Sequence, residues 1–196
     1  MVNDIGNGPR YQNPLNRNAD YGVCEYDLRQ NFVASLVAVS PKFENRLMNI
    51  VAGDWQLSPI ISAHGGFPFN PTLGQDNSRT AEGVDRPNIV GDPYVRNLKT
   101  RVWLNTSAFA APPVGSFGNA GWNSLRGPGF FDMDVSLSRW FTVHESHRLQ
   151  LRFEFFNVTN HVNFNNPSSG LNVATFGTIL GAGNPRILQF AAKYVF

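Results

Sequence analysis

Two neighbouring stretches of the chain alternate apolar and polar residues with a period of two. In residues 130–141, "FFDMDVSLSRWF", apolar side chains recur at every second position, opposite Asp132 and Asp134. Residues 148–158, "RLQLRFEFFNV", resume the alternation after the short polar stretch "TVHESH". Successive side chains of a β-strand point to opposite faces, so the two stretches predict a hairpin with matching apolar and polar faces. The polar positions of the second stretch are Gln150, Arg152 and Glu154.

Three further stretches predict strands. Residues 186–196, "RILQFAAKYVF", place the apolar Leu188 and Ala192 and three aromatic residues on one face. Residues 54–64 alternate less cleanly and contain Pro59, which argues for an edge, a bulge or a strand start there. Residues 29–40 are apolar on both faces. The aromatic residues of the last stretch are Phe190, Tyr194 and Phe196.

The connections between these stretches alternate in length. No segment sustains an apolar period of 3.6, and the 18 Gly and 13 Pro are spread along the chain, so the fold class is predicted to be all-β. Short connections are expected near residues 41–50 and 142–147, and long ones at residues 1–28, 65–129 and 159–185. Long loops therefore fall on one side and short turns on the other, which is typical of outer-membrane barrels with long extracellular loops.

Composition narrows the classes of partner. Charged residues make up 15% of the chain, below the roughly 25% of an average soluble domain, and aromatic residues make up 13%. The net charge of +2 is spread without a basic run, so nucleic acid is not expected as a partner. Cys24 is the only cysteine, which excludes an internal disulfide and a site with several thiolates. The first residues lack the pattern of a secretory signal, so for an exported protein Met1 is not expected to be the natural start.

The alternating pattern fits two architectures. The predicted strands are long enough to cross a bilayer, which takes about 9–11 tilted residues. An aromatic ending suits the girdle at a membrane interface. A free-standing extracellular β-sandwich that binds a ligand shows the same alternation, because its apolar face is covered by a second sheet. The sandwich is therefore kept as the alternative.

Five segments, in a fixed order, are similar to the closing part of the TonB-dependent transporters, in the Oar-like subgroup that carries a carboxypeptidase-regulatory-like domain. The resemblance covers about residues 27–196 and includes the last strand, which resembles the signal that engages the barrel-assembly machinery. The assembly-signal residues on this reading are Phe190, Tyr194 and Phe196. The segments are "WQLSPIISAHGGFPF", "DRPNIVGDP", "SFGNAGWNSLRGPGFFDMDVSLSRWF", "LRFEFFNVTNHVNFNNP" and "FGTILGAGNPRILQFAAKYVF".

The resemblance implies antiparallel up-and-down strands of a transmembrane β-barrel in the bacterial outer membrane. Such transporters have about 22 strands, whereas about five are expected here, so the chain is expected to be the C-terminal part of a larger barrel, either a fragment or a truncated reading frame. Residues 1–28 are then an extracellular loop, and residues 29–196 are the C-terminal part of the barrel. The expected partners are outer-membrane lipid, the barrel-assembly machinery, the remaining strands and plug, and the TonB energy-coupling complex through the missing N-terminal part. The residues expected to face the lumen are Asp132, Asp134, Gln150, Arg152 and Glu154.

Catalytic chemistry is weakly indicated. Paired carboxylates such as Asp134 and Glu154 could serve a glycosidase, but a wall that faces water places polar residues at alternate positions without any catalytic demand, and this account is favoured. "HESH" at residues 144–147 lacks the i, i+4 spacing of the HExxH zinc motif and is expected to be a solvated turn. We therefore expect no enzyme activity, no cofactor and no metal. The expected role is that of a barrel wall and ligand-facing loops for energised uptake of a solute.

Overall fold

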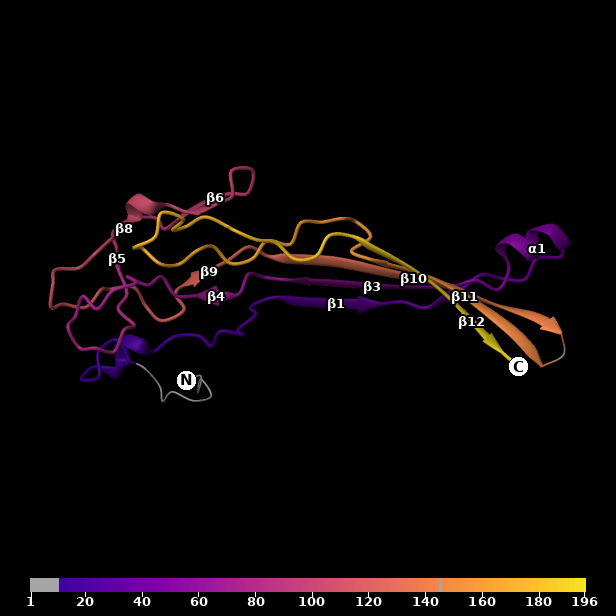
Figure 1. The fold of residues 1–196 in the computed structure, drawn as a ribbon, viewed down its shortest axis with the longest axis horizontal. Coiled ribbons are helices and arrows are strands. Elements are labelled where there is room, and N and C mark those ends of the chain that lie inside the picture. Colours follow the sequence, from indigo (N-terminus) through magenta and orange to yellow (C-terminus); the bar gives the residue numbers. More distant parts are fainter. Residues whose placement is uncertain (1–10, 145) are drawn as a thin grey trace. The chain divides into compact units, whose positions relative to one another are not determined.

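The protein is built mainly of antiparallel strands with little helix, which confirms the all-β prediction (Figure 1). The computed structural model describes residues 11–144 and 146–196. Within these residues, no helix is long and apolar enough to cross a membrane. The strands are β1 (Asn31–Ser35), β2 (Ala38–Val39), β3 (Gln56–His64), β4 (Pro68–Phe69), β5 (Asn88–Ile89), β6 (Tyr94–Asn97), β7 (Val102–Leu104), β8 (Phe109–Ala110), β9 (Leu125–Arg126), β10 (Phe130–His144), β11 (His147–Phe156) and β12 (Ile187–Val195). The helical elements are α1 (Arg46–Ala52) and the 3-10 turns η1 (Arg17–Asp20) and η2 (Thr106–Ala108).

The chain divides into two compact units, which are described separately below. We call them the sheet unit and the loop unit. The sheet unit holds the long strands and α1, and the loop unit holds most of the residues expected to form long loops. The sheet unit consists of Gln30–His64, Phe130–Asn163 and Gly183–Phe196, and the loop unit consists of Gly65–Gly129, Phe164–Ala182 and the described residues up to Arg29.

The long strands of the sheet unit form one antiparallel sheet with the order β1-β3-β10-β11-β12. β2 also pairs with β3. The strands that were predicted from residues 29–40, 54–64, 130–141, 148–158 and 186–196 are therefore neighbours in chain order. This order is the up-and-down arrangement expected from the sequence.

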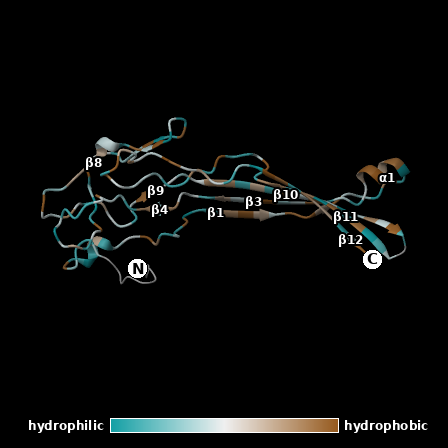
Figure 2. Cartoon of the chain, in the orientation of Figure 1, coloured by the Kyte–Doolittle hydropathy of each residue, from teal (hydrophilic) through white to brown (hydrophobic). Residues whose placement is uncertain are grey.

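The register of the sheet aligns the two kinds of face across the strands. Leu137 of β10 lies opposite Leu57 of β3 and Phe153 of β11, and Phe153 lies opposite Phe190 of β12. Hydrophobic and hydrophilic positions accordingly succeed one another along these strands in Figure 2. We call the side of the sheet that carries Leu137 and these partners the apolar face. It also carries the residues two, four or six positions away from them along each strand. Its hydrophobic residues include Leu57, Ile61, Phe131, Met133, Val135, Leu137, Phe141, Leu149, Leu151, Phe153, Phe155, Leu188, Phe190 and Tyr194.

The predicted strand at residues 29–40 is interrupted opposite Pro59. Pairing with β3 stops at Ser35 and resumes at Ala38 in the same register. Leu36 N donates to Pro59 O at 3.1 Å, so the edge of Pro59 that lacks an N–H faces this strand. Because proline offers no donor there, the ladder is broken between β1 and β2, although β3 itself is a central strand.

The connection expected to be a short turn near residues 41–50 instead contains the helix α1. Asn45 caps this helix, because its side-chain oxygen accepts hydrogen bonds from Leu47 N at 2.9 Å and Met48 N at 3.2 Å. The sequence pattern missed the helix because seven residues are too few to establish an apolar period. The other predicted turn joins β10 to β11, where His144 lies opposite His147.

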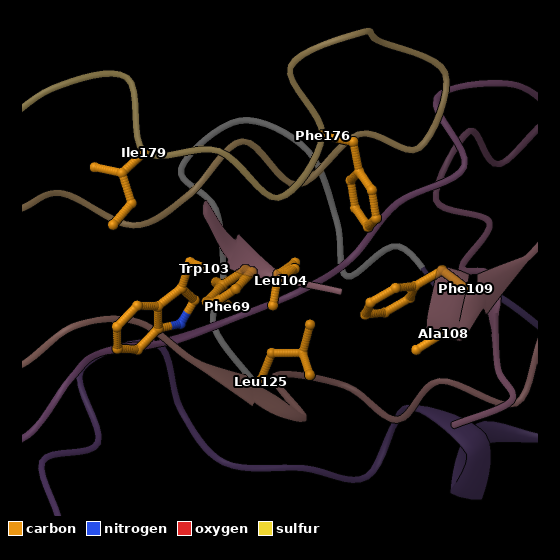
Figure 3. Packing of buried hydrophobic residues seen from close by; sticks show 8 residues of the cluster. All are labelled: Phe69, Trp103, Leu104, Ala108, Phe109, Leu125, Phe176 and Ile179. Carbon is orange, nitrogen blue, oxygen red and sulfur yellow. The ribbon is translucent and has the colours of Figure 1, made fainter. Parts of the chain in front are cut away.

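The loop unit contains the apolar core of the described chain (Figure 3). Three short ladders, β4–β9, β5–β8 and β6–β7, hold stretches that the sequence suggested to be irregular. Among the loop aromatics, Phe69, Trp103 and Phe109 are buried, so they pack the loops together. The core cluster consists of Phe69, Trp103, Leu104, Ala108, Phe109, Leu125, Phe176 and Ile179.

Candidate functional site

The polar side chains singled out in the sequence share one face of the sheet. In the register of β10 and β11, Arg152 lies opposite Ser138 and Glu154 lies opposite Ser136. Strand alternation then places all of these side chains on the face opposite the apolar face. We call this surface the polar face. Its members include Asp132, Asp134, Gln150, Arg152 and Glu154.

The polar face carries an ion pair that is partly exposed to solvent. Arg152 Nη1 lies 3.6 Å from Glu154 Oε1 on the same strand, and the two side chains are 46% and 24% exposed. An ion pair this open contributes little to stability. Arg152 lies opposite Ser138, which is four residues along β10 from Asp134. Arg152 therefore pairs with Glu154 of its own strand and not with Asp134.

A pocket of about 370 Å³ lies on the polar face, at the end of the sheet where β10 begins and β11 ends. Its wall combines two carboxylates, three asparagines and two phenyl rings. Asp132 and Asp134, which the sequence singled out, both line it. The lining residues are Phe130, Asp132, Asp134, Phe156, Asn157, Asn163, Gly183, Asn184, Pro185 and Ile187.

Asn157 organises one wall of this pocket. Its backbone N donates to Asp134 Oδ1 at 2.9 Å, and its side chain donates from Nδ2 to the carbonyl oxygens of His161 at 2.9 Å and Asn184 at 3.3 Å. Its Oδ1 accepts from His161 N at 2.9 Å. Asn157 is 5% exposed and has a φ of 49°, a left-handed conformation that asparagine tolerates better than most residues. The end of β11, the turn that follows it and the segment that leads into β12 are thereby joined.

Asn163 fixes another part of the pocket lining. Its Oδ1 accepts from Phe131 N and its Nδ2 donates to Phe131 O, both at 2.9 Å, so the side-chain amide mimics a neighbouring strand. Asp132 Oδ1 is buried and lacks a hydrogen-bond partner within the described chain. A buried carboxylate oxygen without a partner is costly, which marks this end of the polar face as a candidate site.

Sequence reasoning found the two aspartates of the pocket but missed its asparagines. The stretch "NVTNHVNFNN" is rich in asparagine, which is the signal that could have found Asn157 and Asn163. Its residues act through contacts with segments distant in sequence, such as Asn157 with Asn184. A single sequence does not reveal such contacts.

Of the aromatic residues predicted for the assembly signal, Phe190 and Tyr194 lie on the apolar face, and Phe196 follows the end of β12. Phe190 is 60% exposed, and its ring centroid is 5.1 Å from that of Phe153. Tyr194 is 53% exposed, and its Oη lies 2.8 Å from Nδ1 of His147. Phe196 is 88% exposed. His147 therefore has a partner in the neighbouring strand, while Glu145 of the "HESH" stretch lies outside the described residues.

The loop unit is tied together by a buried arginine. Arg86 is 1% exposed, and its Nη1 lies 2.5 Å from Asp20 Oδ1. Its Nη2 donates to Ala19 O at 2.9 Å and its Nε donates to Ala120 O at 2.7 Å. Gln12 adds a further link, since its Oε1 accepts from Arg86 N at 2.9 Å. A segment near the start of the chain is thereby joined to two distant parts of the loop unit.

Comparison with known proteins agrees with these features. Residues 2–189 match the family described as outer membrane beta barrel domain. Searches of the curated proteins and of the solved structures found no match. The match covers most of the chain, and antiparallel strands with one apolar and one polar face are the architecture such a domain requires. The chain therefore belongs to the outer membrane β-barrel domain family and is a protein of the bacterial outer membrane.

Proposed function

We propose that this chain forms part of the barrel wall and the long extracellular loops of a TonB-dependent transporter of the Oar-like subgroup. On this proposal the apolar face contacts lipid and the polar face lines the lumen. The further strands, the plug and the segment that engages the TonB complex belong to other parts of the whole protein. The solute is bound at the cell surface and admitted when the plug is pulled.

The connections of the sheet support this orientation. At one end of the sheet, His64 lies opposite both Asn31 and Phe130, and Phe156 lies opposite Ile187. Every segment of the loop unit joins the sheet at this end. The β10–β11 turn and α1 lie at the other end, which we call the turn end. Long segments at one end and short ones at the other match extracellular loops and periplasmic turns.

The loop unit is the observation that most favours a transporter over an open pore. Its segments have a buried core and an internal arginine network, so they form a folded body. Within the sheet unit, the pocket on the polar face is lined by two carboxylates and three asparagines, a polar lining that suits a polar solute. Folded loops and a polar pocket suit selective binding of one class of solute.

A free-standing β-sandwich is less well supported. A sandwich needs a second sheet over the apolar face. Within the sheet unit, Leu188 and Phe190 remain 64% and 60% exposed. The described buried hydrophobic residues all belong to the loop unit.

Energy dependence tests the proposal. Cells that produce the whole protein, and cells that lack it, are given a mixture of peptides and oligosaccharides, and loss of each compound from the medium is followed by mass spectrometry. We expect depletion that requires the protein and stops when a protonophore removes the proton gradient. Depletion that continues in the presence of the protonophore would show passive diffusion and overturn the proposal.

Conductance gives a second test that requires no knowledge of the solute. The purified whole protein is inserted in a planar lipid bilayer. Because a plug closes the lumen of such a transporter, we expect no steady ion current. A stable open-channel current from the whole protein would identify it as a porin instead.

A further inference from the structure

Helix α1 exposes nearly all of its apolar side chains. None of its residues is buried. Leu47 and Val51 are each 73% exposed, and Met48 and Ile50 are 53% and 54% exposed. Figure 2 shows α1, an element of the sheet unit, as largely hydrophobic. An exposed cluster of this kind indicates a surface that is covered in the working protein.

Side chains hold both ends of α1. At its C-terminal end, Arg139 donates from Nη1 to Ile50 O at 2.5 Å and from Nη2 to Asn49 O at 2.9 Å. Trp55 Nε1 donates to Val51 O at 2.8 Å, and Ser40 Oγ donates to Ala52 O at 2.7 Å. These donors satisfy the carbonyl groups that a helix end leaves unpaired. With Asn45 as its N-cap, this short helix is fixed to the sheet although its own side chains are not packed.

Two of the residues that hold α1, Arg139 and Trp55, belong to the apolar side of the sheet. Arg139 occupies an apolar-face position between Leu137 and Phe141, and its guanidinium carbon lies 4.7 Å from the centroid of the Phe141 ring. The Trp55 ring lies 6.2 Å from Phe153 and 6.5 Å from Phe141, centroid to centroid. The last turn of α1 is therefore bound to the apolar side of the sheet.

We propose that α1 is an interfacial anchor that lies in the phospholipid leaflet at the turn end of the barrel. This proposal rests on the assignment of the apolar face to lipid and of the turn end to the periplasm. The exposed side chains of α1 are continuous with that face through Trp55 and Arg139, so the lipid that covers the sheet also covers the helix. Leu47 and Val51 would enter the boundary between headgroups and acyl chains, a depth of about 5–10 Å.

Charge and aromatic residues favour the same occupant. Lys42 and Arg46 flank the start of the helix and are exposed, together with a single acidic residue, Glu44. Cations beside an apolar helix are attracted to phospholipid phosphates. Trp55, at the other end of α1, is a residue type enriched at membrane interfaces. The alternative is that a second protein covers α1 and keeps lipid away from it. The test below separates these two cases.

Lipid quenching of site-specific labels tests the anchor. In a Cys24→Ser background of the whole protein, single variants Leu47→Cys and Val51→Cys are labelled with a fluorophore. The protein is folded into vesicles of phosphatidylethanolamine and phosphatidylglycerol. Lipids that carry a spin label either near the headgroup or at the end of the acyl chain serve as quenchers. Leu188→Cys is the reference on the apolar face, and Val114→Cys is the control on an exposed loop.

The proposal predicts a loss of fluorescence at positions 47 and 51, with the shallow quencher more effective than the deep one, and no loss at position 114. If position 188 is quenched but 47 and 51 are not, the anchor is overturned while the lipid-facing assignment stands. Labels at 47 and 51 that resist both lipid quenchers and aqueous iodide would show that protein covers the helix. Lack of quenching at position 188 would overturn the lipid-facing assignment and the anchor together.

Discussion

Arg86 shows how much one side chain contributes to the loop unit. Its guanidinium group reaches Asp20, Ala19 and Ala120, and the Asp20 side chain is only 6% exposed. Removal of one partner from a buried ion pair leaves the other charge uncompensated, which is usually more costly than loss of the attraction itself. The charge of Asp20 is therefore the main source of the destabilisation expected below.

The variant Arg86→Met should lower the free energy of opening of the loop unit by about 3–5 kcal/mol. Hydrogen exchange can measure this at the amides of Leu73 and Ala120, which donate to the carbonyls of the neighbouring residues Asp85 and Pro87. Both amides should exchange much faster than in the parent protein. Lys99→Met removes an exposed cation of the same unit and is the matched control. Equal exchange rates in the two variants would refute the role of Arg86.

Asn157 combines two properties that no other side chain supplies together. Its φ of 49° favours asparagine or glycine, and its amide joins His161 to Asn184. The pocket wall on the polar face depends on both properties. They can be separated, because glycine retains the backbone freedom but lacks the amide.

Asn157→Ala should therefore destabilise the pocket wall more than Asn157→Gly. Both variants lose the side-chain hydrogen bonds, while alanine also carries roughly 1–2 kcal/mol of strain in the left-handed conformation. Hydrogen exchange of the Asn160 amide, which donates to Asn157 O, can report the difference. Slower exchange in the alanine variant than in the glycine variant would show that the strain argument is wrong.

At the scale of elements, the long strands of the sheet could be predicted from the sequence, whereas α1 and the short strands of the loop unit could not. Period-two alternation identified β3, β10, β11 and β12, because side-chain direction in a strand depends only on local geometry. Helix α1, with its Asn45 cap, was too short for any period to appear. The pairing of two-residue strands such as β4 and β9 depends on contacts between segments distant in sequence. The same reason explains why Asp132 was found and Asn163 was missed.

The two faces of the sheet should respond differently to a new charge. Phe153→Arg places a cation on the apolar face, where it should lower the free energy of unfolding in vesicles by about 2–4 kcal/mol near the middle of the bilayer. Ser136→Arg is the control, since Ser136 lies opposite Glu154 on the polar face. It should change stability little. Chemical unfolding in lipid vesicles measures both variants, and similar losses in both would contradict the assignment of the faces.

At the scale of the whole molecule, the sheet of the described chain is open. β1 and β12 are the edge strands, and they do not pair with each other among the described residues. An open edge within lipid leaves backbone groups without partners at a cost of several kcal/mol each, so outer-membrane sheets close into barrels. Further strands are therefore needed beside β1 and β12, as the proposed transporter would provide.

A cysteine scan of β12 tests the account most directly. Positions 187–195 are each labelled with a fluorophore in the Cys24→Ser background, and the whole protein is folded into vesicles that contain brominated acyl chains. We predict a period of two, with strong quenching at positions 188, 190, 192 and 194 and weak quenching at the positions between them. Uniformly weak quenching, or strong quenching on the opposite set of positions, would show that lipid does not contact the apolar face.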